Sequence, residues 1–550
     1  MGSAERLLPD LLARRAAVLG ASALLTHHDH RAGTTRTLGW SEVDAAVDSV
    51  AAWARARSAP GDRVAVLAAQ GPEWVIAFLG VLRAGRIAVP LHSPRVPVNT
   101  CRLARALRDS APALCLTTHA DLALVKGFVA ELATTVAAVD DLPPARCPPP
   151  VLSPDDVAYL QYSSGSTGPP TGIMVTHGNV VANARQAMQA YGADVGSVSV
   201  SWLPLFHDMG LVLAVAGPVV HGMRTVLMDP VAFLERPVRW LRALAEHPDT
   251  VTAAPNFAYG FAAARVTAAD RAGLDLTGVR TMINGGEPAE PGTIDWFHRT
   301  FAECGLRPET HRVSYGLAEA TVLISTTPPG RCRRVTADRA RLGLGELVPS
   351  ATGVTLMSSG RPAGQEVRIV DGGRVLPDDR VGEIWVRGPN VGAGYWGDAE
   401  RTAATFGATL AGVDGVWLRT GDLGVWHEDE LYVTGRTSDV IVLDGRSHYP
   451  QDIESVVESA HPAIRSHHVA AVAVPGPDGD RVVVLAERSR WMVRVDLAEV
   501  AAAVRAAMTG GVPVEVVLLE PGALPCTSSG KVSRSASRKA FLDGVLVPGT

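Results

Sequence analysis

The sequence of 550 residues has few cysteines, few lysines and no long apolar run. Its six cysteines stand far apart, without a CxxC pair or the spacing of metal ligands, so neither a disulfide framework nor a zinc site is indicated. The longest nearly uncharged apolar stretch, 209–223, is shorter than the roughly 20 residues that cross a bilayer. We therefore expect no membrane insertion and a reducing, cytoplasmic setting, with this stretch in the core.

Long runs of like charge are also missing. The chain has 51 basic and 56 acidic residues, which give a formal net charge of −5 and are interspersed along the sequence. Proteins that bind nucleic acid usually carry a basic patch or stripe, so no nucleic-acid partner is expected. A hydrophobic fraction of 47% is typical of a soluble globular protein, and the length predicts about three to four structural units.

Short apolar runs alternate with longer amphipathic stretches along the first half of the chain. Strands are expected at 63–67, 87–91 and 114–117, with helices at 74–84 and 102–108 between them. This alternation predicts an α/β fold with a doubly wound, mostly parallel sheet. The expected division is an N-terminal domain 1–434, with subdomains of about 1–150, 151–330 and a β-rich 358–434, and a small α+β domain 435–550.

Two expectations concern the N-terminal segment. The apolar run from Arg14 to Leu25 predicts an amphipathic helix rather than a signal peptide. The row His27-His28-Asp29-His30 is expected in a solvated loop, because four consecutive residues cannot all face one metal ion.

The most informative stretch is 159–177, where an apolar strand runs into a row of small and hydroxyl-bearing residues before a helix near Asn179. Glycines let a backbone wrap closely around an anion, and Ser and Thr hydroxyls can donate to phosphate oxygens. A flexible hairpin tip is the structural alternative. A Walker A loop is disfavoured because Ile173, not lysine, follows Gly172, and no G-x-S-x-G elbow of a serine hydrolase occurs.

Seven further motifs follow in a fixed order: 202–210 (WLPLFHDMG), 255–259 (PNFAY), 284–288 (NGGEP), 315–319 (YGLAE), 420–423 (TGDL), 435–439 (GRTSD) and 529–531 (SGK). Together with the loop 163–172, they resemble the adenylate-forming superfamily of acyl-CoA synthetases, amino-acid adenylation domains and luciferase. The motifs 202–210 and 255–259 resemble most closely the fatty acyl-AMP ligase branch of this superfamily. The resemblance implies a large N-terminal domain of doubly wound βα subdomains with a β-rich subdomain, followed by a small, mobile C-terminal domain.

The resemblance also implies a set of site residues. For ATP these are Ser163, Ser164, Gly165, Ser166, Thr167, Gly168, Gly286, Glu287, Pro288, Tyr315, Gly316, Asp422 and Arg436. For the acyl group they are His207, Met209, Gly210, Phe257, Ala258 and Gly285. Glu319 and Thr167 are the expected Mg²⁺ ligands, Ser438 lies at the interdomain hinge, and Lys531, His207 and Glu319 are the expected catalytic residues.

Lys531 is one of only three lysines, with Lys126 and Lys539, in a chain that otherwise uses arginine. A compact ammonium can sit between a substrate carboxylate and the α-phosphate of ATP, whereas a planar guanidinium prefers bidentate pairing. The alternative is a solvated basic tail, because Arg534 and Arg538 follow. The rarity of lysine favours catalysis.

His207 stands where amino-acid-activating relatives usually have an aspartate that holds the substrate ammonium. This position argues against an amino acid, although the adjacent Asp208 could turn inward instead. The apolar segments 211–220 and 257–264 suit an acyl tunnel or, equally, ordinary core packing.

Two departures from the wider superfamily occur. Thr171 stands where most phosphate loops have a lysine, so the loop brings no cation of its own, as in the fatty acyl-AMP ligase branch. The segment 331–350 resembles the insertion by which that branch restrains its C-terminal domain and avoids coenzyme A.

The sequence therefore predicts an ATP- and Mg²⁺-dependent enzyme that converts a fatty or other apolar acid to acyl-AMP and pyrophosphate. The acyl group then passes to the phosphopantetheine of an acyl carrier protein, in a polyketide or lipopeptide pathway. The alternatives are an acyl-CoA synthetase of the same fold and, in another class, a non-catalytic acyl or nucleotide sensor.

Overall fold

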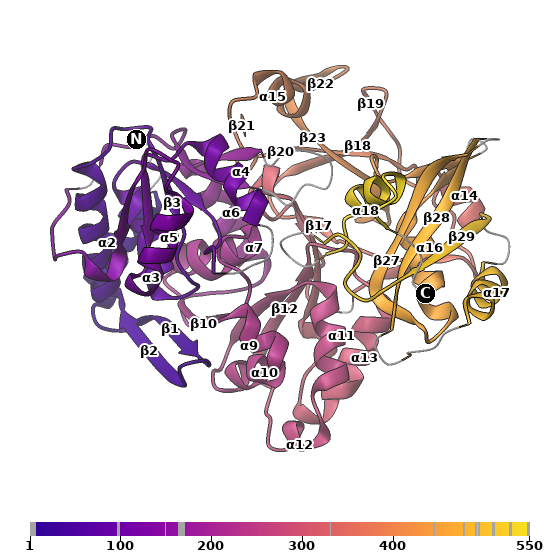
Figure 1. The fold of residues 1–550 in the computed structure, drawn as a ribbon, viewed down its shortest axis with the longest axis horizontal. Coiled ribbons are helices and arrows are strands. Elements are labelled where there is room, and N and C mark those ends of the chain that lie inside the picture. Colours follow the sequence, from indigo (N-terminus) through magenta and orange to yellow (C-terminus); the bar gives the residue numbers. More distant parts are fainter. Residues whose placement is uncertain are drawn as a thin grey trace.

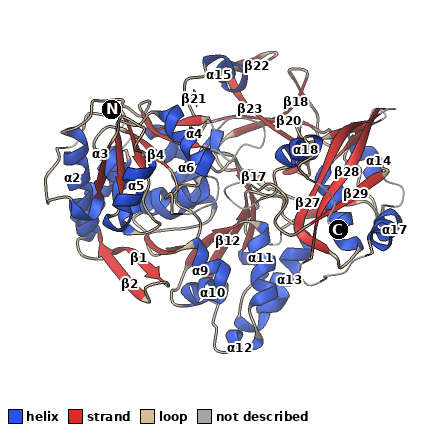
Figure 2. Cartoon of the chain, in the orientation of Figure 1, coloured by secondary structure: helices blue, strands red, loops and turns tan. Residues whose placement is uncertain are grey.

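The computed structural model describes residues 7–95, 100–148, 150–162, 171–330, 332–443, 446–476, 479–489, 492, 496–508, 512–526 and 531–546. Figure 1 shows the N-terminal part at one end of the molecule and the C-terminal segment at the other, with β-rich segments between them. Helices cover the sheets in the N-terminal part (Figure 2). Of the described helices, none is long and apolar enough to cross a membrane.

A seven-stranded sheet forms the N-terminal end, in the order β21-β8-β7-β4-β3-β5-β6. Strands β3 to β7 pair in parallel, and β8 and β21 add antiparallel strands at one edge. The bounds are β3 Arg63–Val66, β4 Ile87–Pro90, β5 Leu114–Thr117, β6 Thr135–Ala138, β7 Val157–Tyr162, β8 Gly172–Thr176 and β21 Gly394–Tyr395. The strands expected at 63–67, 87–91 and 114–117 are therefore confirmed.

The helices of this part are α1 Leu8–Leu19, α2 Trp40–Arg55, α3 Pro72–Arg83, α4 Thr100–Ser110, α5 Leu122–Phe128 and α6 His177–Ala190. Helix α3 is apolar nearly all round and is almost wholly buried. It packs closely on α2, because a Cβ on Gly80 would lie 2.5 Å from Val50. The helices expected at 74–84 and 102–108 are confirmed as α3 and α4, each a little longer than expected.

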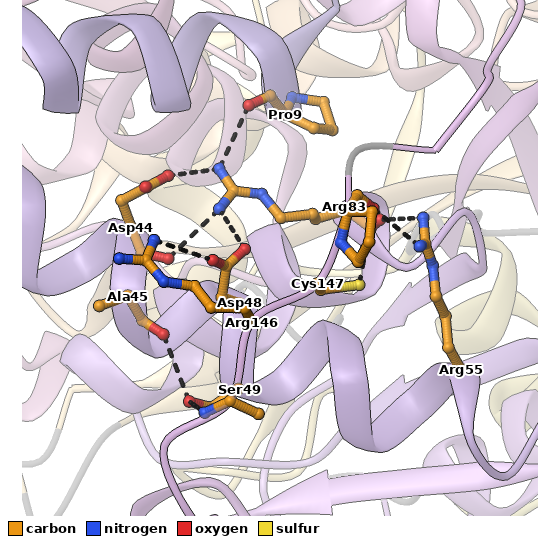
Figure 3. A network of polar contacts seen from close by, with 11 residues as sticks. Pro9, Asp44, Ala45, Asp48, Ser49, Arg55, Arg83, Arg146 and Cys147 are labelled. Atoms are coloured by element: carbon orange, nitrogen blue, oxygen red, sulfur yellow. Dashed lines mark hydrogen bonds and ion pairs between the residues drawn. The ribbon is translucent and has the colours of Figure 1, made fainter.

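A buried ion cluster joins these first helices (Figure 3). The Arg83 guanidinium, 4% exposed, pairs with Asp44 and Asp48 of α2 and donates to the carbonyl of Pro9 in α1. Arg146 approaches Asp48 from the loop before β7, with 3.6 Å between Nη1 and Oδ2. Removing one partner of a buried ion pair leaves an uncompensated charge, so the cluster fixes how the three helices meet.

A nine-stranded sheet forms the centre, in the order β17-β14-β13-β12-β11-β9-β10-β1-β2. Its bounds are β1 Ala23–Asp29, β2 Thr34–Gly39, β9 Val198–Ser201, β10 Arg224–Met228, β11 Thr250–Ala254, β12 Val279–Gly285, β13 His311–Tyr315, β14 Ser325–Thr326 and β17 Arg361–Pro362. The associated helices are α7 Asp208–Leu211, a π-helix Val212–Ala216, α8 Gly217–His221, α9 Pro230–Glu235, α10 Val238–Ala245, α11 Asn256–Arg265, α12 Ala268–Arg271 and α13 Pro291–Phe301. The apolar stretch 209–220 is buried, as expected for core.

Of two expectations about the N-terminal segment, the amphipathic helix is confirmed as α1, although it is shorter than expected, and the solvated loop at His27–His30 is wrong. The first helix ends at Leu19 rather than at Leu25, because Gly20 takes a positive φ and the chain enters β1. Residues His27 to Asp29 belong to β1, paired with β10 and β2, and are half-buried rather than solvated in a loop. The β-branched and apolar residues before them extend this edge of the sheet.

The β-rich part contains a sheet in the order β19-β18-β20-β23-β22, with β24 also on β23. Its bounds are β18 Glu366–Asp371, β19 Arg374–Val375, β20 Gly382–Arg387, β22 Ala408–Leu410, β23 Val413–His427 and β24 Glu430–Arg436, with helix α15 Ala399–Phe406. A two-stranded sheet precedes it, made of β15 Arg334–Ala337 and β16 Val354–Met357, which flank α14 Arg339–Gly343. Short 3₁₀ turns occupy His119–Asp121, Val139–Asp141, Ala302–Cys304, Pro308–Thr310 and Ala318–Ala320.

The C-terminal segment has its own core. Its elements are β25 Ile441–Leu443, β26 Arg446–His448, α16 Pro450–Ala460, β27 Ile464–Gly476, β28 Gly479–Arg488, α17 Leu497–Ala507, β29 Val514–Leu519 and α18 Arg534–Leu542. The sheet β27-β28-β29 has one apolar cluster on each face, and both clusters draw their buried residues from 441 onward. The division of the chain at 434/435 stays a prediction.

Candidate functional site

The expected site residues come from segments that meet at the ends of central strands. Strands β12 and β13 are parallel neighbours, with Gly285 opposite Ser314, so the turns that follow them lie side by side. Backbone approaches are tight here: a Cβ on Gly285 would lie 2.8 Å from the Ser314 carbonyl oxygen, and one on Gly316 would lie 1.6 Å from that of Val322. Glycine at these two positions is therefore a steric requirement.

A polar triad joins β13 to the hairpin of β23 and β24. The Tyr315 hydroxyl donates to Asp422 Oδ2 at 2.8 Å, and Arg436 Nε donates to Asp422 Oδ1 at 2.7 Å. Asp422 and Arg436 are cross-strand partners, and the Asp422 residue is only 5% exposed. The carboxylate of Asp422 raises the pKa of Arg436, and burial raises the pKa of Tyr315. Each oxygen of Asp422 keeps a second lone pair for a ligand hydroxyl.

Glu319 lies in the turn after β13 and contacts the edge strand β21. Its Oε1 accepts a hydrogen bond from the Tyr395 hydroxyl at 2.9 Å. Burial raises the pKa of Glu319, although the hydrogen bond from Tyr395 acts to lower it. A carboxylate in this setting fits a Mg²⁺ ion, which commonly takes one or two protein carboxylates together with phosphate oxygens.

Lys531 reaches the turn after β12 from the C-terminal segment. Its Nζ donates to the Gly286 carbonyl oxygen. Gly286 has φ +80°, and a Cβ there would lie 3.3 Å from Nζ and 3.2 Å from the Met209 sulfur. The structure therefore brings together three expected site residues whose positions in the sequence are up to 322 residues apart.

His207 and Asp208 form a pair at the start of α7. His207 Nδ1 lies 2.5 Å from Asp208 Oδ1, which also accepts from the Met209 amide at 2.7 Å. Desolvation raises the pKa of Asp208, but the charge of His207, these hydrogen bonds and the charge of Lys531 together hold that pKa below its ordinary value. Asp208 does turn inward, and its carboxylate is engaged with His207.

The remaining expected acyl and nucleotide residues lie around these groups. The amide of Phe257, in the first turn of α11, donates to Glu287 Oε1 at 2.6 Å, which fixes the turn after β12. Ala258 is fully buried, and Pro288 is exposed. A Cβ on Gly210 would lie 2.2 Å from the Pro204 carbonyl oxygen, so this glycine has a packing reason of its own.

An ion cluster connects the expected hinge to the segment that carries Lys531. Ser438 is exposed and donates to Asp439, whose other oxygen lies 3.0 Å from Arg534 Nη1. Arg534 also donates to both carboxylate oxygens of Glu454, at 2.7 and 2.6 Å. The start of α18 is thus tied to the hinge and to α16.

The segment 331–350, of which residue 331 is outside the described residues, contacts the C-terminal segment. A Cβ on Gly343 of α14 would lie 3.0 Å from the Ser447 carbonyl oxygen. Leu342 and Tyr449 belong to one apolar cluster. The contact therefore joins this segment to the start of α16.

The expected loop residues Ser163, Ser164, Gly165, Ser166, Thr167 and Gly168 lie outside the described residues. Sequence reasoning missed Tyr395 as a partner of Glu319. Tyr395 reaches Glu319 only because β21 pairs with β8, and no sequence motif signals that pairing.

Comparisons with known proteins find similar chains over nearly the whole length of this one. A model of the family described as AMP-binding enzyme matches residues 14–396. A 4-hydroxyphenylalkanoate adenylyltransferase of Mycobacterium tuberculosis is 40% identical over 574 aligned residues, covering 98% of this chain and 92% of that protein. The long-chain-fatty-acid–AMP ligase FadD32 of Mycolicibacterium smegmatis is 38% identical, covering 96% and 92%. A solved fatty acyl-adenylate ligase from L. pneumophila, in complex with acyl adenylate and pyrophosphate, has a TM-score of 0.76 and 32% identity, covering 98% and 96%.

Proposed function

Because this chain belongs to the AMP-binding enzyme family, we propose that it is a fatty acyl-AMP ligase. It joins a fatty or other apolar carboxylic acid to ATP, giving acyl-AMP and pyrophosphate. The contact that carries the proposal is Lys531 on Gly286, beside Met209 and within the electrostatic reach of Asp208. This contact places a cation between the turn expected to bind the nucleotide and the segment expected to bind the acid.

Each group in the site has a role in this reaction. Tyr315 stacks on the adenine base, and Asp422 with Arg436 holds the ribose hydroxyls. Glu319 binds the Mg²⁺ ion, which neutralises phosphate charge when bound. Lys531 and His207 face the attacking carboxylate and the α-phosphate, where positioning and charge neutralisation supply most of the catalysis. The sequence of the loop 163–170, which includes Thr167, supplies hydroxyl groups that suit phosphate oxygens.

The acid is apolar and carries no ammonium group. The carboxylate of Asp208 is paired with His207 at 2.5 Å, and so it is not poised to hold a substrate ammonium. Phe257 and Met209 offer apolar surface beside this pair, and the relatives are named for a fatty acid and for 4-hydroxyphenylalkanoates. Each methylene group buried there adds about 0.8 kcal/mol of binding free energy.

The acyl acceptor is the phosphopantetheine of a carrier protein rather than coenzyme A. The contact of α14 with Ser447 and the cluster of Leu342 with Tyr449 hold the C-terminal segment against the rest of the chain. These contacts resist the rotation that would open the site to coenzyme A.

The experiment compares Lys531→Ala with Lys539→Ala, using pyrophosphate release with ATP, Mg²⁺ and a fatty acid. Lys539 is an exposed lysine of α18 that pairs with Asp543, so it is a matched control. We expect Lys531→Ala to lose more than 99% of the activity while retaining ATP binding, and Lys539→Ala to keep full activity. Near-normal pyrophosphate release by Lys531→Ala would remove Lys531 from catalysis.

A further inference from the structure

The phosphate loop of this chain lacks a cation. Residues 163–172 contain neither lysine nor arginine, although the loop has to hold the triphosphate of ATP, an anion with about four negative charges. Positive charge near the β- and γ-phosphates must then come from another part of the chain or from the metal ion. Thr171 is the first described residue of this segment, and so its position shows where the C-terminal end of the loop lies.

An arginine from a distant helix contacts that end. Arg401, in the first turn of α15, donates from Nη1 to Thr171 Oγ1 at 3.1 Å. The two residues are 230 positions apart in sequence and meet because β21, just before α15, pairs with β8, just after the loop. The Trp396 amide also donates to the Gly172 carbonyl oxygen at 2.7 Å, which fastens the same junction.

The guanidinium stacks on a tyrosine that also contacts Glu319. Its central carbon lies 4.0 Å from the centre of the Tyr395 ring. The hydroxyl at the far end of that ring donates to Glu319, the carboxylate proposed to bind Mg²⁺. Arg401 and Glu319 thus contact the same tyrosine, and the stacking holds the guanidinium in one orientation before a ligand binds.

Among the described carboxylates, none balances the charge of Arg401. Within the described part of the chain, no acidic side chain pairs with its guanidinium, and Asp398 accepts only from the Arg401 backbone amide, at 3.0 Å. The side chain is also exposed, so a ligand can reach it. An exposed, oriented and uncompensated guanidinium at the end of a phosphate loop is suited to a bidentate phosphate contact.

We propose that Arg401 binds the pyrophosphate end of ATP and replaces the cation that the loop lacks. This inference rests on the proposed function. As the acid's carboxylate oxygen bonds to the α-phosphorus, the bond from that phosphorus to the bridging oxygen breaks, and pyrophosphate leaves with the electron pair. Negative charge therefore grows on the leaving group, where the guanidinium stabilises it.

The test measures the affinity of the protein for α,β-methylene-ATP with Mg²⁺ by titration calorimetry, without any acid. Arg401→Gln keeps a polar side chain but removes the charge, and we expect affinity to fall at least tenfold. The double variant Arg401→Gln with Thr171→Lys puts an ammonium at the same junction, and we expect affinity within threefold of the wild type. Arg265→Gln is the control, since Arg265 is an exposed arginine stacked on Phe261 at 4.8 Å.

The outcomes separate the inference from the proposed function. An Arg401→Gln affinity within twofold of the wild type overturns the inference, and so does a loss that Thr171→Lys does not repair. Because no acid is present, these results do not depend on catalysis. A wild-type protein that binds the nucleotide but forms no acyl-AMP with any acid would instead refute the proposed function.

Discussion

Asp208→Asn is the substitution that most directly probes the acid-activating end of the site. Asp208 Oδ1 holds His207 Nδ1 at 2.5 Å, and so it fixes the ring with Nε2 pointing away from the pair. The amide that replaces the carboxylate keeps the shape and can still accept from the Met209 amide, but it removes the negative charge.

The expected size of the effect follows from the kind of bond that is lost. A charge-assisted hydrogen bond in a buried site contributes about 1.5–3 kcal/mol, and about 1.4 kcal/mol corresponds to a tenfold change in rate. We therefore expect the rate of acyl-AMP formation to fall about 10- to 150-fold. The affinity for ATP should change little, because Tyr315, Asp422 and Arg436 are untouched.

The assay is single-turnover formation of acyl-AMP by Asp208→Asn, by His207→Ala and by the double variant. If Asp208 acts by positioning His207, the double variant is about as slow as His207→Ala alone. A rate of acyl-AMP formation that falls less than threefold in Asp208→Asn would refute the reasoning. A double variant whose rate loss equals the product of the two single losses would refute it as well.

Three further predictions concern nucleotide binding, stability and pH. Asp422→Asn weakens hydrogen bonding to the ribose and should raise the dissociation constant of ATP at least tenfold in titration calorimetry; an unchanged affinity would place Asp422 outside the site. Arg83→Met leaves Asp44 and Asp48 buried without a cation, so the free energy of unfolding in urea should fall by about 3–5 kcal/mol, and a loss below about 1 kcal/mol would contradict the ion cluster. Burial, followed by the nearby charge of Glu290, raises the pKa of Glu458 in α16 to about 8, well above the ordinary glutamate value. The folded protein then holds a proton that the unfolded chain releases, so the stabilising contribution is fully present below about pH 4.5 and is lost as pH rises toward 8. Glu458→Gln should flatten that slope in thermal melts between pH 5 and 8; an unaltered slope would show that Glu458 is not the group responsible.

The sequence predicted the regular elements well where local pattern and burial agree. The strand at 114–117 and the helix at 74–84 were predicted from short apolar runs and amphipathic spacing. The end of the first helix was not predicted correctly. The apolar run continues past Gly20, and the hydrophobic periodicity does not show that the helix ends there. The histidines of β1 were misplaced because a strand near the edge of a sheet can carry polar residues that a loop also carries.

Part of the candidate site was readable, because its motifs are local in sequence. Tyr315, Glu319, Asp422 and Lys531 each lie in a short motif, and the structure places them in three contacts, while their roles stay predictions. The partners of these groups were not readable. Tyr395 contacts Glu319, and Arg401 contacts Thr171, only through the pairing of β21 with β8, which joins segments about 220 residues apart. Such long-range pairing leaves no signal in either segment alone.

The central claim is that the chain makes acyl-AMP and does not pass the acyl group to coenzyme A. The most direct measurement is mass spectrometry of the purified protein with ATP, Mg²⁺ and a panel of fatty acids, with and without coenzyme A. The account predicts that acyl-AMP accumulates and that coenzyme A leaves its amount unchanged. The appearance of acyl-CoA would contradict the account, because the contacts of α14 with the C-terminal segment would then not prevent the opening that coenzyme A needs.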